Sequence, residues 1–570
     1  MLEDKKTKTK FNVLAIIVIV LFCFALSPVT LQNDTYYTLK IGELITQNGI
    51  DMQDHFSWHE DLAYTYPHWA YDTGLYLIYH LGEISGINDG GMLFVYLSTV
   101  ILACALGILM YYTCKKVTKN QLISFLFTLL AMHLLKDFIA ARAQLFTFIL
   151  FVLSVLFIEN FLATKKKRYL IFIVLISIII ANVHVAVWPF FFVIFLPYIA
   201  EYIIASILDF NVISKILVWN KKQAIKRIEK KISKAKDDEI VKILNQKLEE
   251  ANKKLELQIE KAEKLKEKTI EKREKPYKIK IEKNKAAKWL ILVMIICAFT
   301  GLLTPLGDTP YTYLVKTMQG NTTNSISEHQ PLTLYNNKDL MIAVSLVLAV
   351  LIFTDTKIKL RDLFMLGGLL YLTFMSRRQM SMFVLIGVFI FAKFIDYLME
   401  KYDKGGCDKF IKLMTSLLGK TLTIAITVLV CVIIWKPKVD DKFIDSAKYP
   451  VEASSWMLEN LDVENIRIYN EYNYGSYLLF RGIPVFIDSR ADLYAPEFNK
   501  TKDSEGRDIF SDYINISSIG TYYETKFEKY DITNVITYNN SKLNMFISRN
   551  DDYKQLYKDD HFVIYERNVD

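Results

Sequence analysis

The stretch "NDTYYTLKIGELITQNGI" at residues 33–50 directly follows a long apolar run at 11–31. Its larger apolar side chains recur at helical spacing, at Tyr37, Ile41, Leu44 and Ile45. This pattern predicts an amphipathic helix that lies in the membrane interface. Asn33 or Asp34 is a natural N-cap for the helix, and Gly49 is a natural end. An acid held in the first turn is rigidly placed, as a catalytic base must be.

A second interfacial helix is predicted by "PHWAYDTGLYLIYHLGEISG", which begins at Pro67. The loop that contains both helices, 32–91, also carries several acids and histidines: Asp34, Asp51, Asp54, His55, His59, His68 and Asp72. We therefore interpret this loop as a structured, chemically active part of the molecule.

The composition is typical of a protein that crosses a membrane many times. Of the 570 residues, 52% are hydrophobic and 14% are aromatic, and the mean hydropathy is +0.21. Because a span takes about 20 apolar residues, we predict a mainly α fold with about eleven spans, in a membrane domain made of 1–218 and 288–435. The spans are expected near 11–31, 92–113, 121–136, 144–162, 169–183, 185–207, 288–304, 340–354, 360–375, 380–399 and 417–435.

The basic loops indicate how the chain is oriented. "KKTKTK", "TKKKR" and "TDTKIKLRD" all fall on one side of the predicted spans, which the positive-inside rule identifies as the cytoplasm. The N-terminus is then cytoplasmic in the plasma membrane, with 32–91, 305–339 and everything after 436 outside. A retained first span is preferred to a cleaved signal peptide, because no small-residue cleavage site closes the run.

The segment 219–287 differs from the rest of the chain. Residues 221–288 carry a net charge of +11. Because the whole chain has a net charge of +8, the net charge of the other residues is −3. Apolar residues recur there at heptad spacing, which predicts a cytoplasmic helical hairpin or coiled coil; a solvated charged spacer is the alternative. Acids interleaved with the bases argue against nucleic acid as a partner, whereas self-association or a cytoplasmic partner stays open.

The C-terminal segment 436–570 has the pattern of a small extracytoplasmic α/β domain. We expect strands at "IRIYNEY", "PVFIDSR", "NVITY" and "HFVIYER", and helices at "YPVEASSWMLENL", "YGSYLLFR" and "KLNMFISRNDDYKQLY".

Polar and ionisable residues gather at the predicted outer ends of the spans, where they are costly and tend to mark functional sites. For most of them a capping or interfacial role is the alternative. Asp34, Arg142 and His184 stand out because each adjoins apolar sequence without an opposite charge next to it. The pattern indicates a reaction centre on the outer membrane face.

Several motifs resemble those of bacterial membrane glycosyltransferases of the GT-C superfamily. They run in the same order through most of the chain outside the insert: "NDTYYTLKIGELITQNGIDMQDHFSW", "ARAQLFTFIL", "IIANVHVAVWP", "TPLGDTPYTYL", "ISEHQPL", "SRRQMSMF" and "NEYNYGSYLLFRGIPVFIDSRADLY". The sequence departs from the family at Glu328-His329, where a Glu-Trp pair is usual, and at His68-Trp69 with Asp72, where His-Glu-Trp is more common.

The resemblance implies an inverting transfer of a sugar from a polyprenyl-phosphate carrier to a glycan, lipid or protein acceptor. We expect Asp34 to be the base and Asp54 a second acid that either orients the acceptor or binds a divalent cation such as Mg²⁺ or Mn²⁺. Fixed cations should hold the leaving phosphate, and the candidates are Arg142, Arg377, Arg378 and, as a hydrogen-bond donor, His184. Candidates for contacts with the acceptor or the rest of the substrate are His68, Asp72, Glu328, Tyr474, Asp488 and Arg490.

The element around Tyr474-Gly475 is loosely similar to an acceptor motif of oligosaccharyltransferases, although a purely structural strand–turn–helix also explains it. A zinc hydrolase is a further alternative, because His55 and His59 would share one face of a helix. A transporter would place its polar groups near the bilayer midplane in repeated halves, and no internal repeat is visible. A non-catalytic envelope-assembly scaffold is the remaining interpretation.

Overall fold

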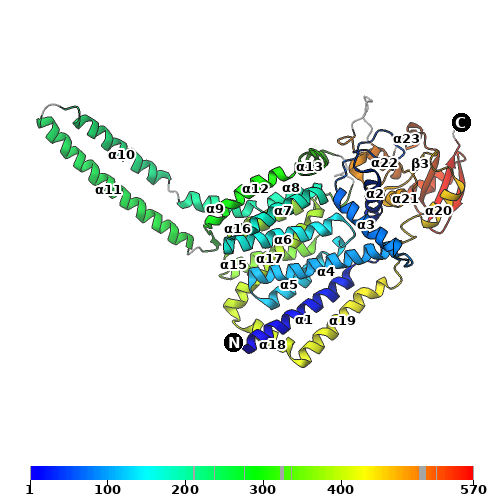
Figure 1. Ribbon diagram of the computed structural model, residues 1–570, viewed down its shortest axis with the longest axis horizontal. Coiled ribbons are helices and arrows are strands. Elements are labelled where there is room, and N and C mark those ends of the chain that lie inside the picture. The colour runs from blue at the N-terminus through cyan, green and yellow to red at the C-terminus, as the bar shows by residue number, and fades with distance from the viewer. Residues whose placement is uncertain are drawn as a thin grey trace. The chain divides into compact units, whose positions relative to one another are not determined.

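The structure is a computed structural model that describes residues 2–209, 212–235, 238–274, 277–320, 326–335, 337–499, 509–520 and 523–568. The chain forms two compact units (Figure 1). One consists of Met1–Val193, Val293–Leu340 and Gly368–Asp570, and the other of Ile194–Leu292 and Met341–Gly367.

A bundle of long apolar helices forms the first part of the larger unit. The helix α1 packs against α4, α5 and α19, while α17 packs against α4, α5 and α6. Three of these helices are joined by polar bonds, because Tyr111 Oη and Gln121 Nε2 both donate to Asn12 Oδ1, at 2.7 and 2.9 Å. The bounds are α1 Leu2–Leu26, α4 Gly90–Thr118, α5 Gln121–Leu134, α6 Ala143–Thr164, α7 Arg168–Val183, α17 Met380–Tyr402 and α19 Leu417–Trp435.

Six helices in the described part of the chain are long and apolar enough to cross a membrane: Lys5–Leu26, Gly90–Thr118, Ala143–Thr164, Val185–Leu208, Arg377–Tyr402 and Leu417–Lys438. The other predicted spans are also helical but shorter: α5, α7, α12 (Lys288–Thr300), α15 (Lys338–Phe353) and α16 (Leu360–Met375). The membrane class predicted from composition is therefore confirmed, whereas the count of about eleven spans remains a prediction.

The smaller unit contains the predicted helical hairpin. Its helices α10 (Val212–Ile232) and α11 (Asp238–Glu274) pack along each other (Figure 1). Their outer surfaces carry exposed ion pairs at i,i+4 spacing, such as Lys253–Glu249 at 3.3 Å, which suits a solvated hairpin. Strands β1 (Ile279–Lys280) and β2 (Ile358–Lys359) pair in parallel at its base. The coiled-coil character and the cytoplasmic side remain predictions.

The first loop forms the two predicted helices, α2 (Asn33–Asn48) and α3 (Trp69–Ile84). They lie so close that a Cβ at Gly42 would collide with the backbone of Asp72. The N-cap of α2 is Gln32 rather than Asn33 or Asp34. Asp34 therefore lies in the first turn, and its carboxylate is free for a partner outside the helix.

The C-terminal domain has a four-stranded sheet of order β3-β4-β6-β5, in which β3 and β4 are parallel and the other pairs antiparallel. The strands are β3 Ile468–Tyr469, β4 Asn534–Tyr538, β5 Tyr553–Lys558 and β6 Phe562–Arg567. Around them lie α20 Val451–Asn460, α21 Tyr472–Phe480, α22 Ile509–Ser517, α23 Tyr523–Lys529 and α24 Lys542–Ile547. The predicted helix at 542–557 is wrong in its second half, which is β5. The predicted strand "PVFIDSR" is an extended segment outside this sheet, joined to the first loop by one bridge between Val485 and Ser57.

The first loop and the C-terminal domain share one aromatic core. Tyr36 of α2 is fully buried, and its ring packs edge-on against Tyr449 and Tyr477, at centroid distances of 5.0 and 5.1 Å. Because large aromatic side chains dominate such cores, this contact fixes α2 against the C-terminal domain.

A buried ion network joins the same two regions. The guanidinium of Arg490 binds Asp54 at 2.6 Å and Asp488 at 2.7 Å, and the charged side chains of Arg490 and Asp54 are 2% and 1% exposed. Tyr494 Oη donates to Asp488 at 2.5 Å. Burial alone would raise the pKa of Asp54, but the charge of Arg490 and two hydrogen bonds from Ser57 lower it below its ordinary value. Both partners of this pair are therefore charged.

We expect Arg490→Met to destabilise the protein by about 3–5 kcal/mol, because two buried carboxylates lose their counterion. The matched control is Arg467→Met, which breaks the exposed pair with Asp531 and should cost no more than about 1 kcal/mol. Denaturant unfolding of the purified protein in detergent measures both values. Equal losses in the two variants would contradict the structural role of Arg490.

Candidate functional site

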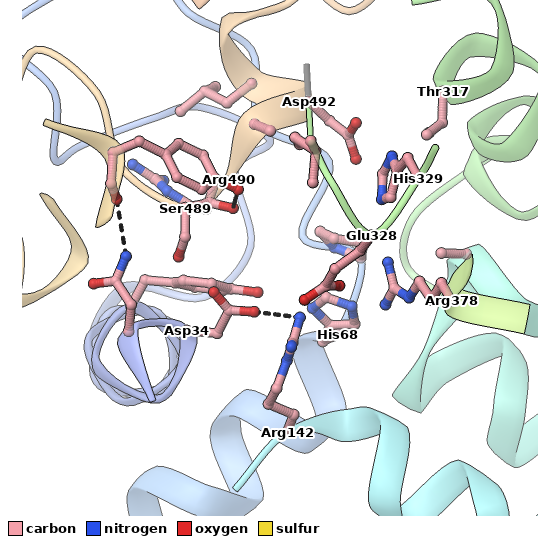
Figure 2. Close-up of a pocket in the computed structure, with 18 of the residues that line it drawn as sticks. Asp34, His68, Arg142, Thr317, Glu328, His329, Arg378, Ser489, Arg490 and Asp492 are labelled. Atoms are coloured by element: carbon pink, nitrogen blue, oxygen red, sulfur yellow. Dashed lines mark hydrogen bonds and ion pairs between the residues drawn. The ribbon is translucent and has the colours of Figure 1, made fainter. Parts of the chain in front are cut away.

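A cavity of about 800 Å³ lies where the first loop, the ends of the apolar helices and the C-terminal domain meet. Side chains from distant parts of the chain point into it, among them Asp34, Arg142, Glu328 and Arg378 (Figure 2). The predicted convergence of the outer helix ends is therefore present. The predicted residues that line the cavity are Asp34, His68, Arg142, His184, Glu328, Arg377, Arg378 and Arg490.

The carboxylate of Asp34 forms an ion pair with the guanidinium of Arg142, the residue before α6 (Figure 2). Thr35 Oγ1 donates to the carbonyl of Ala141 at 3.3 Å, which holds the start of α2 beside that segment. Burial opposes the charge of Arg142, but Asp34 together with Tyr37, Glu328 and Tyr472 outweighs this effect and raises the pKa of Arg142. About a fifth of the Asp34 side chain and a quarter of that of Arg142 remain accessible, so the pair faces the cavity.

Two further arginines lie on the opposite side. Arg377 and Arg378 form the short helix η4 (Arg377–Gln379) before α17. Their backbone N–H groups donate to the carbonyls of Gln330 and Glu328, both at 3.0 Å. These bonds hold the loop that carries Glu328 and His329 at the edge of the cavity (Figure 2).

Three histidines line the cavity close to these arginines: His68, His184 and His329. The rings of His68 and His184 meet edge to face with centroids 4.8 Å apart. Burial, followed by the charges of Arg378 and Arg142, lowers the pKa of His68 to about 3. Burial and Arg378 lower the pKa of His329 to about 4. Both rings are therefore neutral at pH 7.

The C-terminal domain supplies cavity residues that the sequence analysis did not select: Tyr472, Asn473, Ser489, Asp492, Phe510 and Tyr513. Tyr313 Oη, from α13 (Thr309–Gln319), donates to the carboxylate of Asp492. Asp492 follows Arg490 by two residues, and Tyr472 and Tyr313 both lie in motifs already quoted. The quoted motifs therefore contained these residues, but the sequence did not show which of their side chains face the cavity.

Several predicted site residues lie outside the cavity lining. Asp54 and Asp488 are bound to Arg490 in the buried network and do not line the cavity, so their expected contacts with acceptor or metal stay predictions. Asp72 is fully buried between α2 and α3, and burial raises its pKa well above the ordinary value. It is a neutral interior side chain, not a cavity residue.

Tyr474 is also an interior residue. It is fully buried, and its hydroxyl donates to the carbonyl of Ile536 at 2.8 Å. The neighbouring Gly475 lies against Ile487 and Asp488, where a Cβ would collide with the backbone. These contacts favour the structural interpretation of this element, and acceptor contact by Tyr474 stays a prediction.

The zinc interpretation also fails on geometry. Residues 51–66 are all described and contain no helix, so His55 and His59 do not share a helical face. His55 binds Asp51 at 2.6 Å, and the His59 ring nitrogen bonds the carbonyl of Phe486 at 2.9 Å. Within the described ranges there is no group of three or more His, Cys, Asp or Glu residues placed to hold a metal ion.

No protein-family model matches the chain, and no curated protein matches it in sequence. Its fold is similar to solved structures of the oligosaccharyltransferase AglB from Archaeoglobus fulgidus. The apo form matches 92% of this chain and 69% of that chain, with a TM-score of 0.52 at 12% identity. The form tethered through a disulfide to an acceptor peptide with the NVT sequon covers the same shares, with a TM-score of 0.50 at 12% identity.

A third solved structure, AglB in complex with an inhibitory peptide and a dolichol-phosphate, matches 93% of this chain and 69% of that chain, with a TM-score of 0.52 at 11% identity. The chain therefore has the fold of the GT-C membrane glycosyltransferases, as its motifs predicted.

The neutral histidines predict how stability depends on pH. Between about pH 6.5 and 3 an unfolded histidine takes up a proton, whereas His68 in the folded protein does not. The free energy of unfolding should therefore fall as the pH falls through this window. His68→Gln should flatten the dependence, and adding His329→Gln should flatten it further. Thermal unfolding in detergent at pH 7 and pH 5 measures the effect, and identical slopes in wild type and both variants would contradict it.

Proposed function

We propose that this protein is a membrane glycosyltransferase that moves a sugar from a polyprenyl-phosphate carrier to an acceptor in the cavity around Asp34. One observation carries the proposal: a carboxylate and several fixed arginines, from four distant segments, line the same cavity. Glycosyl transfer needs this pairing, because a proton must leave the acceptor while negative charge builds on the leaving phosphate.

In the proposed reaction the acceptor attacks the anomeric carbon of the sugar. The new bond forms between the acceptor heteroatom and that carbon, and the acceptor proton passes to the carboxylate of Asp34. The bond from the anomeric carbon to the phosphate oxygen breaks, and the lipid phosphate leaves with the electron pair. A single displacement of this kind inverts the anomeric centre.

Arginine suits the leaving group, since its planar fork of donors matches phosphate geometry. Arg142 contacts Asp34 through one terminal nitrogen, and a guanidinium has five N–H donors in all. We assign Arg142 the task of connecting the base to the phosphate, with Arg378 and Arg377 binding the phosphate from the other side. Glu328, held at the cavity edge beside Arg378, is the alternative base.

The C-terminal domain is proposed to select the acceptor. It contributes aromatic surface from Tyr472 and Tyr513 and polar groups from Ser489 and Asp492, a mixture that binds polar substrates. The dolichol-phosphate and the inhibitory peptide bound in the AglB structure support a lipid-linked donor and a separate acceptor for this chain as well.

We propose the outer face of the plasma membrane as the side of the reaction, which the distribution of basic loops supports. Among the described residues no group of three or more His, Cys, Asp or Glu is placed to hold a metal ion, and the carboxylate of Asp34 is bound to Arg142. No step of the proposed mechanism therefore runs through a metal, and transfer assays with and without chelator test that point.

Asp34→Asn should reduce transfer by about 10²–10⁴-fold, because the amide keeps the shape of the side chain but cannot accept the proton. The assay is sugar transfer by purified protein from a panel of polyprenyl-phosphate sugars to glycan, lipid and peptide acceptors. Asp51→Asn, in the same loop but outside the cavity lining, is the control for expression and folding.

The results for these variants distinguish the proposed function from the alternatives. If Glu328→Gln abolishes transfer and Asp34→Asn does not, the base is Glu328. If wild type transfers no sugar from any donor, a scaffold or a transporter with this fold becomes the better explanation.

A further inference from the structure

His184 occupies a place that the proposed chemistry has not yet used. It ends α7 at the bend before the short helix η2 (Val185–Val187), and it is 2% exposed while lining the cavity. The bend is held by backbone bonds on both sides, from His184 N–H to Ile180 at 2.9 Å and from Val185 N–H to Pro67 at 2.9 Å. Its imidazole is thus fixed in position.

The two contacts of the Thr147 hydroxyl bear on which ring nitrogen of His184 carries the proton. Nδ1 of His184 lies 3.1 Å from Thr147 Oγ1, and the same Oγ1 lies 2.8 Å from the carbonyl oxygen of Ala143. A hydroxyl has one hydrogen, and a carbonyl oxygen only accepts. When the Thr147 hydrogen goes to Ala143, the shorter of the two contacts, Thr147 Oγ1 accepts a hydrogen bond from Nδ1–H of His184.

The other ring nitrogen is then a bare acceptor. Nε2 of His184 is buried and has no hydrogen-bond partner within the described part of the chain. Burial lowers the pKa of His184 well below its ordinary value, and His68, Arg378 and Arg142 act in the same direction. The ring is a neutral imidazole with its Nε2 lone pair unpaired.

We propose that Nε2 of His184 accepts a hydrogen bond from a hydroxyl of the sugar on the lipid-linked donor. This assignment rests on the proposed glycosyl transfer and replaces the predicted role of His184 as a donor to phosphate. Two acceptors repel each other, so a phosphate oxygen does not fit against a bare lone pair, whereas a hydroxyl does. Thr147 is the positioning residue, because it sets the tautomer without touching the substrate.

The tautomer is tested without any substrate. The chain has only eight histidines, so ¹⁵N-histidine solid-state NMR of the whole protein in lipid, with His184→Gln to assign the signal, resolves this ring. We expect Nδ1 to carry the proton and Nε2 to be unprotonated at pH 7. Thr147→Val should shift the population toward the Nε2–H form, while Thr147→Ser should keep the Nδ1–H form. An Nε2–H tautomer or an imidazolium in the wild type would overturn the assignment.

The sugar contact is tested with donors in which one hydroxyl at a time is replaced by hydrogen. At one position we expect wild type to prefer the parent donor by about 10- to 100-fold in kcat/KM, because the analogue leaves a buried acceptor unpaired. Thr147→Val and His184→Phe should lose most of that preference, and Thr147→Ser should retain it. If parent donors are transferred and no position shows this difference, the His184 assignment is wrong. If no parent donor is transferred, it is the proposed function that fails, and the NMR result still reports the tautomer.

Discussion

The buried guanidinium of Arg490 is the constraint on which the cavity depends. A charge this deep is tolerated only when it is paired, and its partners come from two regions far apart in sequence, Asp54 in the first loop and Asp488 in the C-terminal domain. The ion network and the aromatic core around Tyr36 therefore hold these regions together. Because α2 is fixed in this way, Asp34 in its first turn is held against Arg142 at the cavity wall.

The charges inside the cavity follow a simple division. One side holds the Asp34–Arg142 pair, and the other holds Arg377 and Arg378. The histidines close to the arginines are neutral, because burial and the positive charge of the arginines both disfavour protonation of the rings. Such a site offers an acceptor for a proton, fixed cations for an anion and a lone pair for a hydroxyl, which together match the needs of sugar transfer from a lipid phosphate. The similarity to AglB supports the fold, and the residues of this chain support the chemistry.

Much of this arrangement could be predicted from local sequence. The helix at 33–48 follows from its periodicity, and the selection of Asp34, Arg142 and His184 followed from isolated polar groups at the ends of apolar runs, where polar groups are costly. The burial of Asp54 and Tyr474 could not be predicted, because their partners are distant in sequence: Arg490 lies 436 residues from Asp54, and Ile536 lies 62 residues from Tyr474. The helix predicted at 542–557 includes residues 553–557, which instead belong to β5 and pair with the adjacent strand β6. Contacts outside the local segment, which a single sequence does not display, account for these differences.

The central claim is that the arginines of this cavity bind a lipid-linked phosphate beside Asp34. The most direct test is equilibrium binding of a polyprenyl phosphate without sugar to the purified protein in lipid nanodiscs. Arg378→Gln and Arg142→Gln should each weaken binding by about tenfold or more, because a charge-assisted hydrogen bond is lost. Asp34→Asn should leave the affinity unchanged or increase it, since a competing negative charge is removed. Unchanged affinity in both arginine variants, or weaker binding in Asp34→Asn, would contradict the account.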